Sequence, residues 1–379
     1  MKILFLVYHG FSEVSGISKK IHYQVKGLRE NGHEVHLCYY GFAPDGHRCR
    51  YVDGHVLKDY GTGLLAALRQ RMDYGDVYNY CIRNGLEFVY ARSFQNANPF
   101  LIRFFRRLRL AGIKAVTEVP TYPYDHEFDN FGLGARMELK VDQMFRNRLS
   151  REMAAIVTFS DATRIFGQRT IRISNGVDFD SIPLHCYQPP QDGSIHLVGV
   201  AEVHLWHGYD RLITGLGEYY RLTARPRQVY FHIVGGVHPY ERYRANDYHP
   251  GLQAIIDRYG LHEHIIFHGQ LFGEPLDQVF NQCVFAIGSL ARHRSGITVI
   301  KTLKNREYAT RGIPFIYSEQ DSDFDNRPYV LKAAADESPI DVARILDFID
   351  RHHFNPQDIR QSVSHLAWKR QMELVIGQA

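Results

Sequence analysis

Residues Lys2–Tyr40 read KILFLVYHGFSEVSGISKKIHYQVKGLRENGHEVHLCYY. The opening segment Lys2–Tyr8 is apolar and rich in β-favouring side chains, which predicts a buried strand. Apolar residues then recur at helical spacing from Ile17, and Asn31-Gly32 is a typical helix stop. A second β-favouring segment follows at Glu34–Tyr40. A strand, a glycine-bearing loop, a helix and a strand form a βαβ unit, so we predict a parallel sheet with a right-handed crossover.

The same alternation of strands and helices continues along the chain. In the first half, further strands are expected at Glu87–Ala91, Lys114–Glu118, Ala155–Phe159 and Ile171–Ile173. In the second half, strands are expected at Ile195–Val200, Val229–Val234, Ile265–His268, Val284–Ile287 and Ile313–Tyr317. Between the halves, the periodicity lapses over Asn175–Gly193, a loop with three prolines that we interpret as a hinge.

Length and composition agree with two ordinary globular domains. The chain has 379 residues, and single hydrophobic cores stop growing near about 250–300 residues. Its 45% apolar and 23% charged residues exclude a disordered, collagen-like or fibrous chain. The net charge, 45 − 41 = +4, does not suggest a dedicated nucleic-acid binder. Five scattered cysteines without a C-x-x-C pair favour a reducing cytoplasm.

The loop His9–Ile17 is the first candidate for ligand binding. A glycine at a helix N-terminus lets backbone N–H groups approach a phosphate or a sugar oxygen. The loop is neither G-x-G-x-x-G nor a P-loop, because Gly16 is followed by Ile-Ser. A simple tight turn explains these residues equally well.

A stronger signal is the segment Lys301–Ile316, KTLKNREYATRGIPFI. It predicts a helix that ends at Gly312, followed by a buried strand. The loop before it, Arg292–Thr298, is basic and rich in hydroxyl groups, which suits a diphosphate at a helix N-terminus. Glu307 lies inside the helix with Lys304 at i−3, so an exposed ion pair is its simplest structural explanation.

Glu307-Tyr-Ala-Thr-Arg-Gly-Ile-Pro-Phe-Ile resembles the second half of the E-x7-E signature of retaining glycosyltransferases of family 4. Three other segments are similar to family motifs in order and spacing, and together they extend the resemblance over essentially the whole chain. They are Ser15-Gly16 with Gly27–Val35 (glycine loop and second strand), Ser174–Asp178 (N-G-V-D), and Val198–Ile213 (G-R…K-G…L-I).

The resemblance implies the GT-B architecture, an α/β fold in which two Rossmann-like domains with parallel sheets face a central cleft. We expect an N-terminal acceptor-binding domain at residues 1–175 and a C-terminal sugar-nucleotide-binding domain at residues 176–360. A C-terminal helix at residues 361–379 is expected to cross back to the first domain. The implied activity is a hexosyltransferase reaction (EC 2.4) that moves a sugar from a nucleotide-diphosphate sugar to a glycan or lipid-linked glycan in surface polysaccharide biosynthesis. Anomeric configuration is retained, and neither a metal nor a cofactor is required.

The resemblance also implies roles for individual residues. Glu307 would hydrogen-bond the ribose of the donor nucleotide. The other implied donor contacts are Gly16, Glu202, His207, Arg294, Ser295, Gly296, Ile297, Thr298 and Lys301.

The sequence departs from the family pattern at three places. Val299 occupies the position of the first glutamate of E-x7-E. Glu202 and His207 stand near the places of the arginine and lysine that grip the diphosphate. Glu118 stands where many relatives have a histidine that faces the reacting sugar. The cationic role is therefore expected to shift to Arg211, Arg294, Lys301 or Lys304, and the predicted catalytic residues are Glu118, Arg211 and Lys304.

No metal site is predicted. Asp321-Ser-Asp323 matches D-x-D in letters, but it follows a strand of the second domain and is interpreted as a polar loop. No two histidines lie at i,i+4 beside a carboxylate, the spacing typical of zinc ligands on a helix.

One segment bears on location. Asn98–Gly112 predicts a capped helix that contains no acid and carries Arg103, Arg106, Arg107 and Arg109. Such a helix could lie on an anionic membrane surface, or it could pack on the core with a solvated cationic face. The sequence favours neither. The expected location is the cytoplasm, with the inner face of the cell membrane as the membrane-bound alternative.

Two other functions remain open. The first is a sugar-nucleotide epimerase of the same architecture, which would act without an acceptor. The second is a catalytically silent binding subunit, suggested by the missing first glutamate and the displaced cations. Dinucleotide-dependent oxidoreduction ranks last because its glycine fingerprint is absent.

Overall fold

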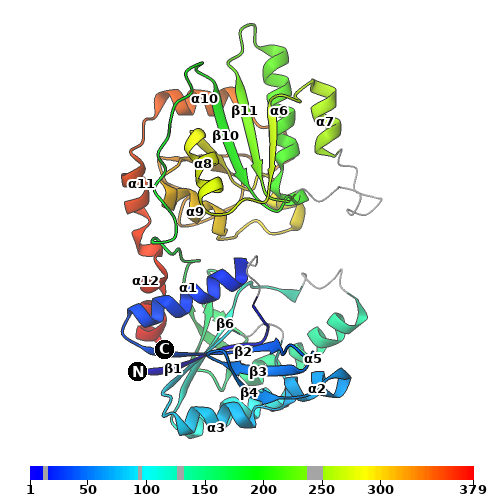
Figure 1. Ribbon diagram of the computed structural model, residues 1–379, viewed down its shortest axis with the longest axis vertical. Coiled ribbons are helices and arrows are strands. Elements are labelled where there is room, and N and C mark those ends of the chain that lie inside the picture. The colour runs from blue at the N-terminus through cyan, green and yellow to red at the C-terminus, as the bar shows by residue number, and fades with distance from the viewer. Residues whose placement is uncertain (12–15, 93–95, 126–131, 237–250) are drawn as a thin grey trace. The chain divides into compact units, whose positions relative to one another are not determined.

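The computed structural model describes residues 1–11, 16–92, 96–125, 132–236 and 251–379 (Figure 1). The chain forms two compact units. Unit 1 comprises Met1–Gly176 together with Leu366–Ala379, and unit 2 comprises Val177–His365. Each unit has its own parallel-rich sheet covered by helices, so the predicted α/β class is confirmed.

The sheet of unit 1 has nine strands in the order β4-β3-β2-β1-β5-β6-β7-β9-β8. Their bounds are β1 Lys2–Val7, β2 Glu34–Phe42, β3 Arg48–Val52, β4 His55–Asp59, β5 Phe88–Arg92, β6 Lys114–Val119, β7 Ala155–Thr158, β8 Arg164–Ile165 and β9 Gln168–Arg172. The predicted βαβ unit is confirmed, because β1 and β2 pair in parallel with Lys2 opposite Glu34. Two antiparallel additions, β3–β4 and β8, were not predicted.

Helices cover both faces of this sheet because the strands are apolar on both sides. The helices of unit 1 are α1 Gly16–Glu30, α2 Gly63–Met72, α3 Gly75–Arg83, α4 Pro99–Leu110, α5 Leu133–Ser150 and α12 Trp368–Gln378. Along β1, Ile3 and Phe5 belong to the core shared with α1 and α12. The alternate residues Leu4 and Leu6 belong to the core shared with α3 and α4.

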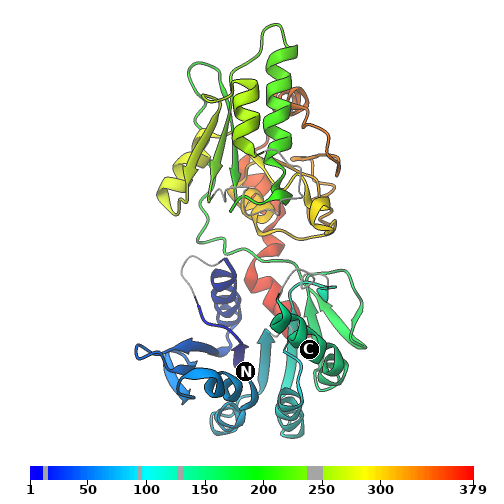
Figure 2. The ribbon, with the colours of Figure 1, turned by 90° about the vertical axis from the view of Figure 1, so that its right-hand side faces the viewer.

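Helix α12 lies beside α1, as Figure 2 shows. Two glycines allow this close approach. A Cβ on Gly27 would lie 2.7 Å from the backbone carbonyl carbon of Trp368, and a Cβ on Gly176 would lie 2.4 Å from its indole ring. The C-terminal helix expected at residues 361–379 is interrupted. Helix α11 Pro356–Ser362 and a 3-10 turn precede α12, and the break falls where the chain returns to unit 1.

The sheet of unit 2 has six parallel strands in the order β12-β11-β10-β13-β14-β15. Their bounds are β10 Ile195–Val200, β11 Val229–Val234, β12 Ile265–Gly269, β13 Phe285–Ile287, β14 Phe315–Tyr317 and β15 Val330–Lys332. The chain builds outward from β10 to β12 and then returns to β13 on the other side. The point between β10 and β13 is therefore a topological switch point, and ligands of open α/β sheets bind beyond the carboxyl ends of the strands there.

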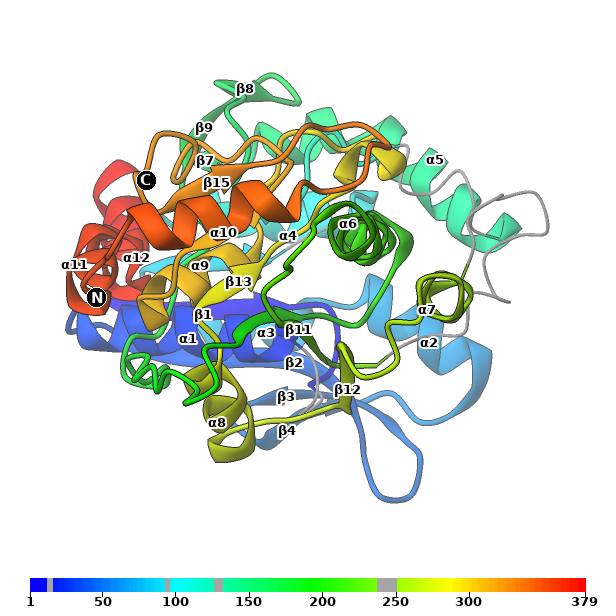
Figure 3. The same cartoon turned by 90° about the horizontal axis from the view of Figure 1, so that it is seen from above.

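The remaining helices of unit 2 are α6 Tyr209–Leu222, α7 Leu252–Tyr259, α8 Glu274–Gln282, α9 Leu303–Arg311 and α10 Val342–Arg351. Helices α6 and α7 lie side by side (Figure 3), and together with α10 they bury the main core of the unit against the strands. The opposite side of β10 contacts α8.

A chain of hydrogen-bonded histidines crosses three strands of unit 2. His196 Nδ1 lies 2.7 Å from His232 Nε2, and His232 Nδ1 lies 2.8 Å from His268 Nε2. At the other end, Ser194 Oγ lies 3.0 Å from His196 Nε2 and donates to Asp192 Oδ1 at 2.6 Å. Because a carboxylate only accepts hydrogen bonds, this arrangement gives all three rings the Nε2–H tautomer. This histidine chain accounts for three of the 21 histidines in the sequence.

The arginine-rich segment forms α4, and its apolar residues, among them Leu101, Phe105 and Leu108, are buried in unit 1. Arg106 and Arg109 each bind Glu152 with a contact of 2.9 Å. The buried apolar face is therefore unavailable to a bilayer, and the exposed side of the helix carries its guanidinium groups together with Phe100 and Leu110. No helix in the described part of the chain is both long enough and apolar enough to cross a membrane.

Candidate functional site

Buried polar atoms without hydrogen-bond partners gather at the switch point of unit 2. Among the described residues, they belong to the loops after β13 and β14 and to the first turn of α9. We call these residues the switch-point cluster: Ser289, Arg292, Thr302, Lys304, Asn305 and Glu319. Leaving such groups unpaired costs about 1–3 kcal/mol each, so their concentration beyond the carboxyl ends of parallel strands indicates a ligand site.

The cluster is held together by short contacts. Asn305 Nδ2 donates to Glu319 Oε1 at 3.3 Å. Gly288 permits the close approach of α9, since a Cβ there would lie 3.0 Å from Asn305 Oδ1. Ser318 donates its backbone N–H to Ser289 O at 2.9 Å, which ties the loop after β14 to the loop after β13.

Burial controls the charge of the cluster. Burial, reinforced by the positive charge of Arg292, lowers the pKa of Lys304 to about 7, while Glu319 acts in the opposite direction. Burial raises the pKa of Glu319 above its ordinary value. Two cationic side chains thus face one carboxylate whose ionisation is disfavoured. An incoming phosphate would favour the protonated ammonium of Lys304, because an opposite charge nearby favours the charged form.

His207 occupies the position near which the family pattern has a lysine, and it is buried. Its Nδ1 accepts a hydrogen bond of 2.9 Å from the backbone N–H of His204. Burial, followed by the nearby charges of Lys304 and Arg292, holds the pKa of His207 well below its ordinary value. The imidazole is therefore neutral at pH 7 and cannot replace the charge of a lysine.

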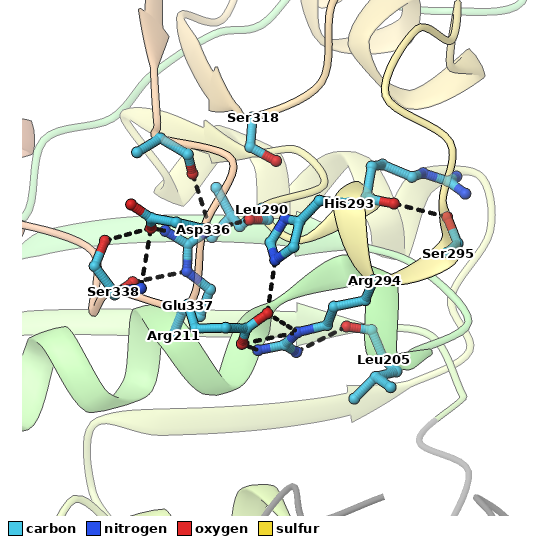
Figure 4. Close-up of polar contacts among 12 residues, drawn as sticks. Leu205, Arg211, Leu290, His293, Arg294, Ser295, Ser318, Asp336, Glu337 and Ser338 are labelled. Carbon is cyan, nitrogen blue, oxygen red and sulfur yellow. Dashed lines mark hydrogen bonds and ion pairs between the residues drawn. The ribbon is translucent and has the colours of Figure 1, made fainter.

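Arg211 and Arg294 are already engaged by protein groups (Figure 4). Arg211 donates from Nε to Ser338 O at 2.7 Å and from Nη1 to Ala334 O at 3.1 Å, and it also contacts Leu290 O and Asp336. Arg294 binds both carboxylate oxygens of Asp210 at 2.9 and 2.8 Å and also pairs with Glu337. Their predicted roles toward the donor stay predictions, and these contacts favour positioning of the loops.

The expected ion pair between Glu307 and Lys304 is wrong. Glu307 instead accepts from Arg311 Nε at 3.0 Å, and Arg311 also binds Asp277 at 2.6 Å. Lys304 is part of the switch-point cluster on the same helix. The carboxylate of Glu307 remains partly accessible, with 29% of the side chain exposed.

The predicted donor loop connects β13 to α9. Ser295 ends a 3-10 helix and donates from Oγ to Arg292 O at 2.8 Å, and Gly296 follows with φ +69°. Thr298 O accepts from the backbone N–H of Gln320 at 2.7 Å. Ile297 and Lys301 lie on the same loop, whereas Glu202 follows β10. Val299, at the position of the missing first glutamate, is 53% exposed.

In unit 1, Glu118 lies at the carboxyl end of β6 and is fully buried. It contacts Arg92 Nε at 3.1 Å and Lys20 Nζ at 3.5 Å, and it accepts from Gln24 Nε2 at 2.6 Å and from Tyr90 OH at 2.5 Å. Burial alone would raise the pKa of Glu118, but Lys20 and Arg92 outweigh it and lower the pKa to about 2. The carboxylate is therefore ionised and already carries four partners.

Gly16 begins α1. Residues 12–15 of the predicted glycine loop, including Ser15 of the family motif, lie outside the described residues.

No family model and no curated protein matches this chain. Solved structures do match it along its whole length. Sucrose-phosphate synthase from Thermosynechococcus elongatus has a TM-score of 0.61 and 13% identity, covering 100% of this chain and 98% of that one. The catalytic domain of starch synthase IV from Arabidopsis thaliana has a TM-score of 0.59 and 11% identity, with coverage of 99% and 98%. This chain has the GT-B fold.

The same GT-B fold also hosts other chemistry. A putative UDP-N-acetylglucosamine 2-epimerase from Listeria monocytogenes matches with a TM-score of 0.52 and 10% identity, covering 99% of this chain and 94% of that one. At such identities the likeness identifies the fold alone, so the activity must be argued from the site.

Sequence reasoning missed five residues of the switch-point cluster, which are Ser289, Arg292, Thr302, Asn305 and Glu319. Ser289 and Glu319 follow β13 and β14 directly, so the rule that ligands bind beyond strand ends could have identified them. Arg292 lay within the predicted basic loop, but Arg294 was preferred there.

Proposed function

We propose that this protein is a glycosyltransferase whose unit 2 binds a nucleotide-diphosphate sugar. The observation that carries the proposal is the switch-point cluster, which combines the ammonium of Lys304, the guanidinium of Arg292 and unpaired hydroxyl and amide groups. Charge-assisted hydrogen bonds from such groups suit the oxygens of a diphosphate.

The proposed chemistry is electrostatic. Lys304 and Arg292 stabilise the negative charge that develops on the departing diphosphate, and a buried site makes this stabilisation strong. Glu307 lies at i+3 from Lys304 on α9, and such residues are neighbours on a helix surface. A carboxylate beside the diphosphate site is well positioned for the hydroxyls of the adjoining ribose, which supports the role proposed for Glu307.

The finer features of the reaction rest on the resemblance to family 4. We propose retention of anomeric configuration, no requirement for a metal, and a glycan or lipid-linked glycan acceptor in surface polysaccharide biosynthesis. The proposed location is the cytoplasm, with the inner face of the cell membrane as the membrane-bound alternative. The exposed guanidinium groups of α4 support attraction to anionic lipids.

Thermal-shift measurements with UDP-, GDP-, dTDP- and CMP-sugars, followed by transfer assays with the stabilising donor, test the proposal. Lys304→Met keeps the volume of the buried stem and removes the unpaired ammonium, so folding should persist. We expect the donor-induced shift to disappear in this variant and to remain in Lys369→Met, which removes an exposed lysine of unit 1. Wild-type donor affinity in Lys304→Met would contradict the proposed site.

Sugar-nucleotide epimerisation is the second candidate, because a putative epimerase shares the fold. Isomerised nucleotide sugar formed without an added acceptor would favour it. A silent binding subunit would bind the donor without turning it over, so slow release of free nucleoside diphosphate would exclude that role.

A further inference from the structure

Unit 1 contains an open pocket of about 410 Å³ that no role above has assigned. Small-molecule pockets are commonly about 300–1,000 Å³. Three segments form the wall: the loop after β6, the carboxyl end of α5, and the turn between β8 and β9. The lining residues are Tyr122, Arg146, Asn147, Arg151, Phe166 and Gly167.

Phe166 forms one wall from an unfavourable backbone conformation. It has φ +50° and is followed by Gly167 with φ +82°, so both central residues of this two-residue hairpin turn have positive φ. Such turns strongly prefer Asn-Gly, and a bulky residue at positive φ costs free energy. The strained turn is held by a hydrogen bond of 2.8 Å from Ser150 Oγ to Phe166 O.

The strained turn positions the ring of Phe166 beside the guanidinium of Arg146. The guanidinium of Arg146 lies 4.5 Å from the ring centroid of Phe166. Asp125 holds that guanidinium through two hydrogen bonds of 2.6 and 3.1 Å. The ring of Tyr122 meets Phe166 edge-on at 5.8 Å. The result is a rigid aromatic wall with an already neutralised arginine behind it.

Arg151 supplies charge that is not neutralised. It is exposed, and within the described ranges it has no ion pair. Arg164 and Arg169 lie on the β8–β9 hairpin, and they likewise have no acidic partner in the described part of the chain. The field at the pocket is therefore positive, which favours an anion.

We propose that this pocket binds a sugar ring that carries a carboxylate or a phosphate. The apolar face of the ring would stack on Phe166 and Tyr122, as ring faces do on aromatic side chains. The anionic group would bind Arg151, and the side-chain amide of Asn147 would hydrogen-bond a hydroxyl group. This site belongs to unit 1 alone and stands whether or not unit 2 binds a nucleotide sugar.

Calorimetric titration of the full chain with glucuronate, glucose 1-phosphate, inorganic phosphate and glucose tests the proposal. We expect one or both acidic sugars to bind at least about tenfold more tightly than glucose, because a charge-assisted contact is lost with the neutral sugar. The tighter of the two identifies the group as a carboxylate or a phosphate. Equal binding of glucose would overturn the anionic specificity.

Two variants assign the binding to this pocket. Arg151→Gln should lower the affinity for the acidic sugar at least about tenfold. The control Arg148→Gln removes an equal charge one helical turn away and should change this affinity less than about twofold. An equal loss of affinity in both variants would show that the anion is attracted by overall charge and not bound by Arg151. The acidic sugar should still bind to Lys304→Met. Loss of binding in that variant would show that the sugar binds at the switch-point cluster of unit 2 instead.

The variant Phe166→Asn tests stacking of the sugar ring without disturbing the fold. It creates Asn-Gly, the preferred pair for this turn, so the relieved backbone offsets the lost aromatic contact and the melting temperature should stay close to that of the wild type. Affinity for the acidic sugar should fall to that of inorganic phosphate. Unchanged sugar affinity in a folded Phe166→Asn protein would overturn the stacking part of the proposal.

Discussion

Lowering the pH from 7 to 5 is expected to destabilise unit 2 through its histidine chain. His232 lies in the middle of this chain and is 3% exposed. Burial, followed by the neighbouring His196 and His268, lowers its pKa to about 4. The unfolded chain protonates at the ordinary histidine pKa of about 6.5. At pH 5 the unfolded state therefore binds more protons than the folded state, and stability falls as the pH falls.

The magnitude follows from the difference between the two pKa values. For His232 alone, linkage predicts a loss of about 2 kcal/mol in the free energy of unfolding between pH 7 and pH 5. The pKa values of His196 and His268 are also lowered by burial, so they add to the loss. The other groups at the chain are Asp192, reached through Ser194, and the ring of Tyr230, which stacks on His196.

Hydrogen exchange measured at increasing urea concentration follows each unit through its own peptides. Unit 2 should lose stability between pH 7 and pH 5. His232→Phe, which keeps a ring but cannot titrate, should lose about 2 kcal/mol of that dependence. His262→Gln, an exposed histidine of the same unit, serves as the control. Full pH dependence in His232→Phe, or stabilisation of unit 2 at pH 5, would refute the reasoning.

Three further predictions concern the proposed reaction and the packing of unit 1. Glu307→Ala should lower the rate of sugar transfer by about tenfold or more, because a hydrogen bond to the ribose is lost. Circular dichroism should show an intact fold, and wild-type turnover would contradict the ribose-binding role of Glu307. EDTA should leave the transfer rate unchanged, and a loss restored by Mg²⁺ or Mn²⁺ would contradict the metal-free mechanism. Gly27→Ala should destabilise unit 1 by about 1–3 kcal/mol, because its Cβ would overlap the backbone of Trp368; an unchanged urea midpoint for unit 1 peptides would contradict this packing.

The parallel strands were predictable because they are buried on both faces and therefore appear as continuous apolar runs. The two hairpins were harder to predict from the sequence. The β3–β4 hairpin turns at Asp53-Gly54, both with positive φ, and that dipeptide is a recognisable turn signal between short strands. The β8–β9 hairpin turns at Phe166-Gly167, which carries no such signal because phenylalanine is rare at this position.

For the candidate site in unit 2, the sequence predicted which loops form it but not which side chains are available to a ligand. Motif spacing pointed to the segment before α9, and Lys304 was one of four cations expected to take over the diphosphate contact. It could not show which side chains are engaged elsewhere, because partners come from distant positions. Arg211 is bound by groups near residue 336, and Glu118 by side chains of α1 and β5. Whether a charged residue is available to a ligand depends on such long-range contacts, which a single sequence does not reveal.

The return of α12 to unit 1 has a consequence for synthesis on the ribosome. Unit 1 is assembled from two segments that are separated in the sequence by all of unit 2. Its core includes Trp368, Met372 and Val375, so that core stays incomplete until these residues have left the exit tunnel. Unit 2 is continuous and can close its core first. The part of the chain that is translated first is thus the part that finishes folding last, and during that interval the apolar residues of α1 that share this core, Ile21, Val25 and Leu28, lack their partners from α12.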